Sequence, residues 1–434
     1  MATVETVLTS LNGNFKNVYG EKISNLVPQS DILYRNDRFK FVSKQGREGL
    51  QYNQPVILSL PTSATWGLNA PTLNNPIAMQ MANAVVTGSA ITTRDILSYD
   101  AAARAASSDA AFEDTLGLVM RTLMQAHSKL CEIDLLYGNG SIASGISLAQ
   151  SVSVVASGAN AAATITYGTW APALFSGMQN ALLDAYQGGT KINTNAGLQI
   201  VSINVVPASN TVGGVVTLSG NAADITALKA ASGGVAIDFY WYNAYGNNVV
   251  GLSGILQNTG TLFGINAASY DLWQSNVFDC QSSQLTFSKL QQAIALAVGR
   301  GLDEPVVALV SPVTFADLLN EQAGARMFDE SYKPKQLENG WEAIQFWGPS
   351  GKIEIVPHMY VHQGEAFVVP PKQVIKVGPM ADISPTVPGL KGEIFLQSPT
   401  TAAYEIRLFS DFGLLNNMPA KSVYIKNIVN SISA

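Results

Sequence analysis

One stretch of this 434-residue chain constrains its fold more than any other, the segment Asp109–Tyr137, which reads DAAFEDTLGLVMRTLMQAHSKLCEIDLLY. Its apolar residues recur at alternating four-residue and three-residue steps, a spacing that brings them onto one face only in a helix. We therefore expect a single helix of about 44 Å with one buried face. The core residues expected on that face are Phe112, Leu116, Val119, Leu123, Leu130 and Ile133.

Both ends of this helix are marked in the sequence. Asp109 or Ser108 can cap the first amides, and Gly138 supplies the left-handed residue at which helices commonly end. Charged residues interrupt every window of about 20 residues, which excludes a membrane span. Two interpretations stay open, a two-stranded coiled coil and a spine helix packed across a mixed α+β domain.

The composition indicates that much of the surface is covered by other protein. Asp, Glu, Lys and Arg make up 13% of the residues, about half the usual share, while 47% are hydrophobic. No apolar signal-peptide core opens the chain, so we expect a cytoplasm-like compartment. Cys131 and Cys280 are too few for a disulfide framework and are expected to be buried free thiols.

Residues 49–93 contain no Asp, Glu, Lys, Arg or His. Disordered segments stay solvated through charge and low hydrophobicity, and this segment has neither. Its pattern of a β-rich run, a turn-rich middle and a β-rich return predicts a long two-stranded excursion that needs a partner surface. The apolar side chains expected to make that contact are Val56, Leu58, Leu60, Trp66, Met79 and Met81.

The rest of the chain alternates between helical and strand patterns, which predicts an α+β fold. Residues 169–187 are expected to form a second helix, and 190–265 a β-rich insertion with strands up to the segment NVVGLSGIL and exposed turns such as 210–214. Later helices are expected at 285–303 and 312–322, and strands at 305–311, 352–371, 393–399, 402–416 and 422–432.

No pattern of a reaction centre is present, so no catalytic, cofactor-binding or metal-binding residues are predicted. The sequence has no GxSxG or HExxH motif, and the glycines after Tyr137 lack the spacing of a phosphate loop. His358 and His362 are expected on one strand, about 13 Å apart and too far for shared metal binding. Asp238, Tyr240 and Tyr242 share a strand face and could stack on a sugar or base, but ordinary packing is the simpler interpretation.

The order of these features resembles the major capsid proteins of tailed bacteriophages with the Hong Kong ninety-seven fold. The resemblance is carried by VPQSDIL, GSAITTRDILSYDAAARAA, LLYGNG, GLSGILQNTGTLFGI and YEIRLFSDFGLL, and it extends over most of the chain. It implies an N-terminal arm (N-arm) at 1–37, an extended loop (E-loop) at 38–100, a peripheral domain with the spine helix at 101–145, an axial domain at 146–380 that includes the insertion at 190–265, and returning peripheral strands at 381–434.

The resemblance also implies a function. The protein would be no enzyme and would self-assemble as hexamers and pentamers into an icosahedral shell around viral double-stranded DNA, with weak non-specific contact to the DNA and none to a membrane. Its place would be the virion capsid, assembled in the host cytoplasm with a separate scaffolding protein, a portal and, in some members, decoration proteins. Covalent cross-linking is not expected, because Lys40 and Lys44 are near the base of the E-loop and no Glu follows Glu405.

Two alternatives remain. An encapsulin-type cellular compartment would share the shell fold, and genes for a terminase and portal rather than a cargo enzyme would exclude it. A cytosolic glycan-binding or glycan-processing protein built on residues 190–265 would stay monomeric, so the size of the purified protein separates it from a shell.

Overall fold

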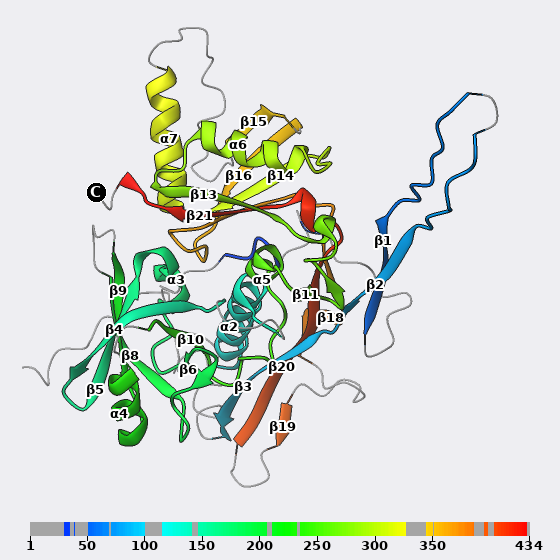
Figure 1. Cartoon of the computed structure of the whole chain (residues 1–434). Helices are drawn as coiled ribbons and strands as arrows, with labels where there is room; N and C mark the ends of the chain where they lie inside the picture. The colour runs from blue at the N-terminus through cyan, green and yellow to red at the C-terminus, as the bar shows by residue number, and fades with distance from the viewer. Residues whose placement is uncertain are drawn as a thin grey trace, which may run out of the picture.

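The computed structural model describes residues 30–34, 39, 51–68, 71–99, 115–140, 146–205, 211–231, 235–326, 344–349, 351–385, 395–397 and 403–431. Within these ranges, helices pack on sheets in which antiparallel pairs predominate (Figure 1). Only β13 with β21 and β14 with β16 run parallel. The predicted α+β class is therefore confirmed.

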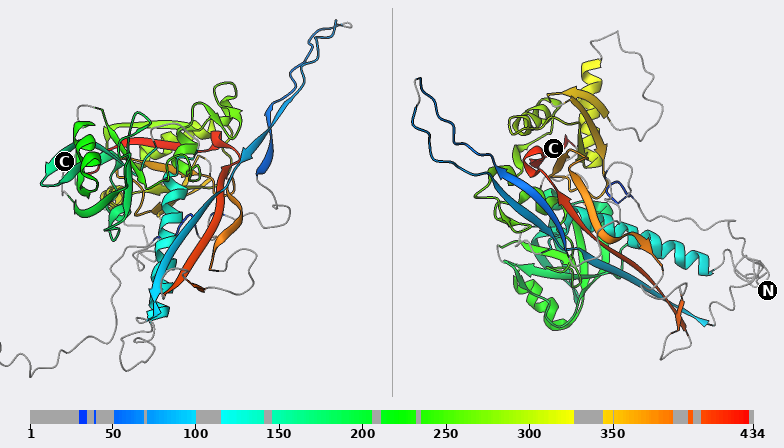
Figure 2. Two further views of the ribbon diagram at one scale, coloured as in Figure 1. Left: turned by 90° about the horizontal axis from the view of Figure 1, so that it is seen from below. Right: turned by 90° about the vertical axis from the view of Figure 1, so that its right-hand side faces the viewer.

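A long hairpin projects from the body of the molecule (Figures 1 and 2). It consists of β1 (Tyr52–Ser59) and β2 (Gln80–Val86), paired antiparallel from Tyr52 opposite Val86 outward. At its base Ala84 and Val86 are buried. The two-stranded excursion predicted for the charge-free segment is confirmed.

The chain leaves the hairpin along a second long sheet. β3 (Ser89–Ser98) pairs antiparallel with β20 (Ala403–Asn416), from Ser89 opposite Phe412 to Ser98 opposite Ala403. β20 also pairs with β18 (Val374–Ser384) and β19 (Phe395–Gln397). Strands far apart in sequence thus form the sheet on which the long helix lies.

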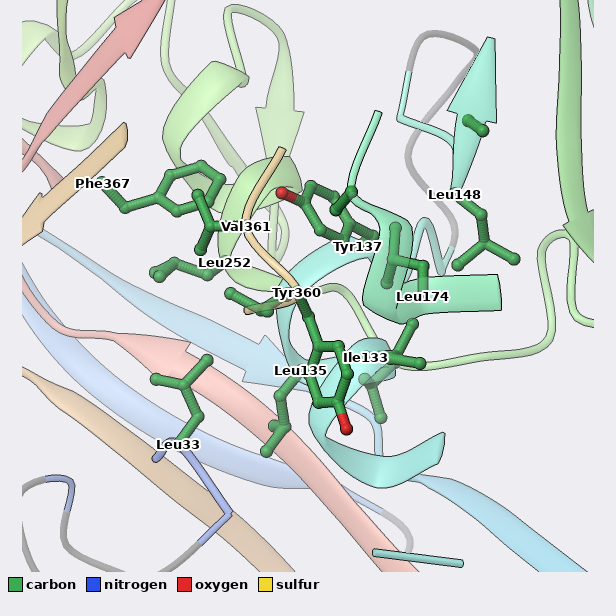
Figure 3. Close-up of a cluster of buried hydrophobic side chains, with 14 of the residues drawn as sticks. Leu33, Ile133, Leu135, Tyr137, Leu148, Leu174, Leu252, Tyr360, Val361 and Phe367 are labelled. Atoms are coloured by element: carbon green, nitrogen blue, oxygen red, sulfur yellow. The ribbon is translucent and has the colours of Figure 1, made fainter. Parts of the chain in front are cut away.

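The long helix α2 is described from Thr115 to Tyr137. Leu123 packs against Ile406 and Leu408 of β20, whereas from His127 onward nearly every side chain is buried. Figure 3 shows this buried end of α2 among apolar side chains of several other segments. The predicted start at Ser108 or Asp109 and the residue Phe112 lie outside the described residues.

The prediction that Gly138 is the left-handed residue at the end of the long helix is wrong. Gly138 does not have a positive φ; the left-handed residue is Gly140, with φ 47°. A Cβ on Gly138 would lie 2.2 Å from the carbonyl oxygen of Val249, and Gly138 O accepts from Gly251 N at 2.7 Å. Glycine is needed here because two backbones approach each other closely.

A six-stranded sheet holds the second core, with the strand order β13-β21-β17-β14-β16-β15. Helices α6 (Phe287–Val298) and α7 (Pro312–Arg326) pack around it as predicted, and Thr286 caps α6. The C-terminal part of the chain thus contributes β20 to the sheet with β3 and β18, and β21 to this six-stranded sheet. The strands are β13 (Asn276–Ser283), β14 (Val306–Val310), β15 (Ile344–Gly348), β16 (Gly351–Pro357), β17 (Ala366–Val369) and β21 (Val423–Ile428).

A third sheet closes on itself, because β10 pairs with both β4 and β6. The remaining neighbours follow in the order β4-β5-β9-β8-β6-β7, and α4 (Ala222–Ala231) packs against β4 and β5. The β-rich unit therefore begins well before residue 190. Its strands are β4 (Ala149–Ser157), β5 (Asn160–Thr166), β6 (Leu182–Gln187), β7 (Thr190–Lys191), β8 (Leu198–Val205), β9 (Val212–Ser219) and β10 (Ile237–Trp241).

The helix predicted for residues 169–187 is wrong. Only the short α3 (Pro172–Phe175) forms, and residues 182–187 are the strand β6. Gly177 and Asn180 both have positive φ, 77° and 70°, so the chain turns between the two elements. Closure of the third sheet then holds β6 between β8 and β10.

The strand predicted in the segment NVVGLSGIL is also wrong, because residues 252–257 form the helix α5 (Leu252–Gln257). A short apolar run that is buried all round has no periodicity to separate helix from strand. The remaining short elements are β11 (Thr261–Leu262), β12 (Ile265–Asn266) and the 3₁₀ turns η2 (Tyr167–Thr169), η3 (Asp271–Trp273) and η4 (Pro419–Lys421).

Candidate assembly surface and the clamp behind it

The outer half of the hairpin exposes large apolar side chains. Trp66 is 86% exposed and Leu68 is 94% exposed. Of the predicted contact residues, Val56 and Leu58 are half-buried against the core of the chain itself, whereas the others are exposed: Leu60, Trp66, Met79 and Met81. The structure thus divides the predicted set into a base that packs on its own chain and a tip with uncovered surface.

Asn74 holds the two arms of the tip together. Its backbone N–H donates to Thr65 Oγ1 at 2.9 Å, and its side-chain Nδ2 donates to the carbonyl oxygen of Ala64 at 2.7 Å. Nearer the base, Gln80 N donates to Ser59 Oγ at 3.2 Å. An amide side chain bridges a gap between strands without adding charge, so the tip keeps an extended shape and a neutral surface.

The helix residues predicted for the core differ in how far their side chains are buried. Leu123 and Ile133 are buried, whereas Val119 and Leu130 are half-buried. Phe112 and the side chain of Leu116 lie outside the described residues. Around this helix the structure also places charged groups inside the fold, which the apolar pattern gave no reason to expect.

Glu132 of α2 is fully buried and binds the backbone of the segment before the hairpin. Its Oε1 accepts from the amides of Ile32 at 3.1 Å and Leu33 at 2.8 Å, and its Oε2 accepts from that of Tyr34 at 2.6 Å. His358 Nε2 donates to Oε1 at 2.6 Å. Four donors satisfy the carboxylate, which makes its burial tolerable. We call Glu132, His358 and the amides of residues 32–34 the clamp.

Two further contacts support the clamp. Ser128 Oγ donates to Asp31 Oδ1 at 2.7 Å. The buried Lys376 of β18 donates to the carbonyl oxygen of Tyr34, and its Nζ lies 5.4 Å from the centroid of the Tyr34 ring. The helix, the strand β18 and the loop after β16 therefore all hold the described part of the predicted N-arm.

The prediction that His358 and His362 share a strand is wrong, because both follow the end of β16 at Pro357 in a loop. His358 Nδ1 accepts from Tyr360 N at 3.2 Å, which leaves the Nε2 proton for Glu132. His362 Nε2 lies 3.0 Å from the carbonyl oxygen of Leu148, and Tyr137 stacks on the ring at 3.9 Å. Each histidine joins the loop to a different part of the core.

Burial shifts the pKa of other groups on α2. It lowers the pKa of His127 to about 4, because the imidazolium would lose its hydration. The neutral ring lies 3.0 Å from Thr93 Oγ1 and 2.5 Å from Ser410 Oγ, which joins the helix to β3 and β20. Burial raises the pKa of Asp134 to about 7, although Asn248 Nδ2 donates to this carboxyl at 2.7 Å.

The tyrosines of β6, β10 and the turn after β10 pack mainly against one another. Because β10 ends at Trp241, Tyr242 lies in that turn and not on the strand predicted to carry it with Asp238 and Tyr240. Tyr186 stacks on Tyr245 with ring centroids 4.1 Å apart, and the buried Tyr240 meets both rings edge-on. Lys191 Nζ lies 5.2 Å from the Tyr242 ring centroid. These contacts occupy the ring faces that a sugar or a base would need, so they favour packing over a stacking platform.

The arrangement of hairpin, long helix and sheets has counterparts among solved structures. The chain matches no family model and no curated protein in sequence. The capsid asymmetric unit of cyanophage A-1(L) aligns over 98% of this chain and 99% of its own, with a TM-score of 0.57 and 10% sequence identity. This chain has a phage capsid fold.

Two other structures are similar to this capsid fold at lower scores. The capsid of the native GTA particle aligns over 99% of the chain and 100% of its own, with a TM-score of 0.49 and 8% identity. The capsid asymmetric unit of cyanophage Pam1 aligns over 99% and 100%, with a TM-score of 0.44 and 14% identity. The predicted capsid fold is confirmed on the A-1(L) match.

Nothing in the described part of this capsid fold suggests a metal centre, since no three or more His, Cys, Asp or Glu residues come together there in a way that could hold an ion. No described helix has both the length and the apolar character needed to cross a bilayer. Cys131 and Cys280 are free and buried, as predicted.

Proposed function

We propose that this protein is a major capsid protein, whose copies assemble as hexamers and pentamers into an icosahedral shell around viral double-stranded DNA. In this role the protein binds other copies of itself and catalyses no reaction. The observation that carries the proposal is the projecting, charge-free hairpin with an uncovered apolar tip on a chain with a capsid fold. A contiguous apolar surface of this kind marks a site of protein contact.

The domain division follows from the same proposal. Residues 1–37 are the N-arm, 38–100 the E-loop, 101–145 the peripheral domain with its spine helix, 146–380 the axial domain, and 381–434 the returning strands. The β-rich insertion predicted at about 190–265 belongs to the axial domain as part of the larger closed sheet that starts with β4. The exposed hairpin residues Leu60, Trp66, Met79 and Met81 serve the contact with a neighbouring subunit, whereas Val56 and Leu58, also predicted for this contact, pack on the core of their own chain.

The partners follow from the function. A separate scaffolding protein and a portal direct assembly in the host cytoplasm, decoration proteins are candidates for the outer surface, and the DNA inside meets only weak non-specific contact. The net charge of −6 supports the last point, since tight phosphate binding needs clustered Lys and Arg.

Size-exclusion chromatography and electron microscopy of the protein, expressed alone and with its scaffolding protein, test the proposal. We expect megadalton shells or ring-shaped capsomers. A strictly monomeric protein at all concentrations and with scaffold present would overturn it. Nuclease-protected double-stranded DNA in particles from infected cells separates a virion shell from the encapsulin-type alternative, which would carry a cargo protein instead.

A further inference from the structure

A cavity of about 350 Å³ lies at the base of the hairpin, where β2 passes into β3. Its walls are Val85 and residues 87–89 of the hairpin base, Gly140 after α2, residues 246–248 with Val250, and the β11–β12 turn at 261–264. Hydrogen bonds hold these walls together. Val85 N donates to the Phe263 carbonyl oxygen at 2.9 Å and Ser89 Oγ donates to that of Asn247 at 2.5 Å.

The chemistry of the cavity suits an uncharged side chain that has both apolar and polar surface, because polar and apolar groups line it in nearly equal parts. No Asp, Glu, Lys, Arg or His lines it. Apolar wall residues such as Val250 and Phe263 alternate with glycine backbone, hydroxyl groups and the side chain of Asn247. The volume is at the low end of the range of about 300 to 1,000 Å³ typical of ligand pockets, so it suits a single large side chain.

The hairpin tip offers such a side chain but cannot reach the cavity of its own chain. Val85 lies 17 positions after Leu68, a stretch of at most about 55 Å when extended, and β2 is held extended by its pairing with β1. Both views in Figure 2 show the hairpin directed away from the body, while its base forms one wall of the cavity. The exposed tip and the open cavity are therefore complementary only between two copies.

We propose that the hairpin tip, with Trp66 as its anchor, docks into this cavity of a second copy of the chain. The proposal rests on the proposed function and names the docking site of the hairpin on the neighbouring subunit. Both surfaces are neutral, so no charge is buried without a partner. A buried indole N–H needs an acceptor, which the Asn247 side chain and the loop carbonyls supply.

The symmetry of this contact agrees with a shell. Each copy gives one tip and receives one at a different place on its surface, which makes the interface heterologous. Heterologous contacts form closed rings when the rotation between neighbours closes. Hexamers and pentamers need an interface of this kind.

A cysteine pair tests the docking directly. Leu68→Cys, two residues from the Trp66 anchor and 94% exposed, is combined with Thr87→Cys in the cavity wall, and a control combines Leu68→Cys with Thr226→Cys, exposed on the remote helix α4. The native thiols are both buried and do not compete. Under mild oxidation of particles we expect a ladder of linked subunits from the first pair and single subunits from the control. Particles of the first pair that stay unlinked would overturn the docking.

A cavity-filling variant gives an independent readout. Thr87→Trp fills the cavity from its own chain, and Thr226→Trp is the matched control. We expect both to fold, as shown by equal melting temperatures, with particle yield lowered at least tenfold for Thr87→Trp alone. Normal yield from Thr87→Trp would contradict the docking. A wild-type chain that never forms large assemblies would overturn the proposed function itself, whereas normal particles in which the Leu68–Thr87 cysteine pair does not link would overturn the docking alone.

Discussion

Glu132 brings a charge into the interior, and its bonds to three backbone amides and His358 offset the cost of burying it. In Glu132→Gln one oxygen of the carboxylate becomes an NH₂ group that faces N–H donors. We expect unfolding in urea at pH 7 to show a loss of about 3 kcal/mol, as for other broken buried pairs.

Asp303→Asn is the matched control for this variant. The side chain of Asp303 is 76% exposed and pairs with Lys421 at 2.5 Å. Exposed pairs contribute at most about 1 kcal/mol, so its loss should be small. Equal stability of the Glu132 and Asp303 variants would show that the clamp does not hold the arm segment.

His127 makes the stability of the subunit depend on pH. Its pKa is about 4 in the folded protein against 6.5 for the unperturbed group, so between these values the unfolded chain binds more protons. The contribution of His127 to stability therefore falls as the pH drops from about 6.5 to 4, by about 3 kcal/mol at pH 4. Unfolding free energies of wild type and His127→Gln across this range measure the effect.

The difference between the unfolding free energies of wild type and His127→Gln gives the contribution of His127 alone. The raised pKa of Asp134 acts in the opposite direction over the whole of this range, but it is common to both proteins and cancels in the difference. A wild-type curve parallel to that of His127→Gln between pH 6.5 and 4 would contradict the buried neutral state of His127.

At the scale of elements, the helix α2 depends on its buried face. Leu123 is 9% exposed and contacts Ile406 and Leu408, whereas the next residue, Met124, is 38% exposed. Leu123→Asp buries an unpaired carboxylate at a cost of several kcal/mol, enough to prevent a stable subunit and hence assembly. Met124→Asp should fold and assemble. Soluble yield and particle formation are the measurements, and normal particles from Leu123→Asp would show that this face is not packed.

The closed sheet permits a sharp test of two turns. Gly158, between β4 and β5, has a φ of 60° and open space around a built Cβ, whereas a Cβ on Gly213 would lie 2.2 Å from that of Trp170. The exposed turn predicted at 210–214 thus overlaps the start of β9. A six-residue tag after Gly158 should leave folding and particle yield unchanged, and one after Gly213 should abolish soluble protein. Equal tolerance at both sites would contradict the packing of Trp170 on β9.

Periodicity predicted the elements whose burial has one face. Helices α2 and α6 and the strands of the hairpin each repeat an apolar residue with the period of their structure, whereas α7 was indicated by Pro312 at its first position. The failures at 169–187 and 252–257 are short buried segments, where closure of the sheet or close contact with Gly138 decides the conformation. No local pattern encodes such contacts.

The apolar tip of the hairpin was predictable because its lack of charge is a local property of the sequence. The clamp was not. Glu132 reads as one more charge on a helix, and its partners lie about 100 residues before it and 226 after it. One signal was present, since Glu132 lies beside Ile133 in the most apolar part of the helix, where a charge needs a partner.

At the scale of the whole molecule, the described residues form three larger sheets, the small β11–β12 pair and a projecting hairpin. Covering about 600 Å² of apolar surface at roughly 25 cal/mol per Å² contributes about 15 kcal/mol before the cost of ordering the chain. A two-stranded hairpin is marginal alone, so contact with a neighbour should order the tip. Assembly and order of the hairpin are therefore linked.

Hydrogen–deuterium exchange of residues 60–79, compared between unassembled subunits and particles, tests this link most directly. Residues 306–310 of the buried strand β14 are the internal control and should be protected in both states. We predict fast exchange of the hairpin tip in free subunits and strong protection in particles. Equal exchange of the tip in the two states would contradict the account, because it would mean that shell formation leaves the hairpin uncovered.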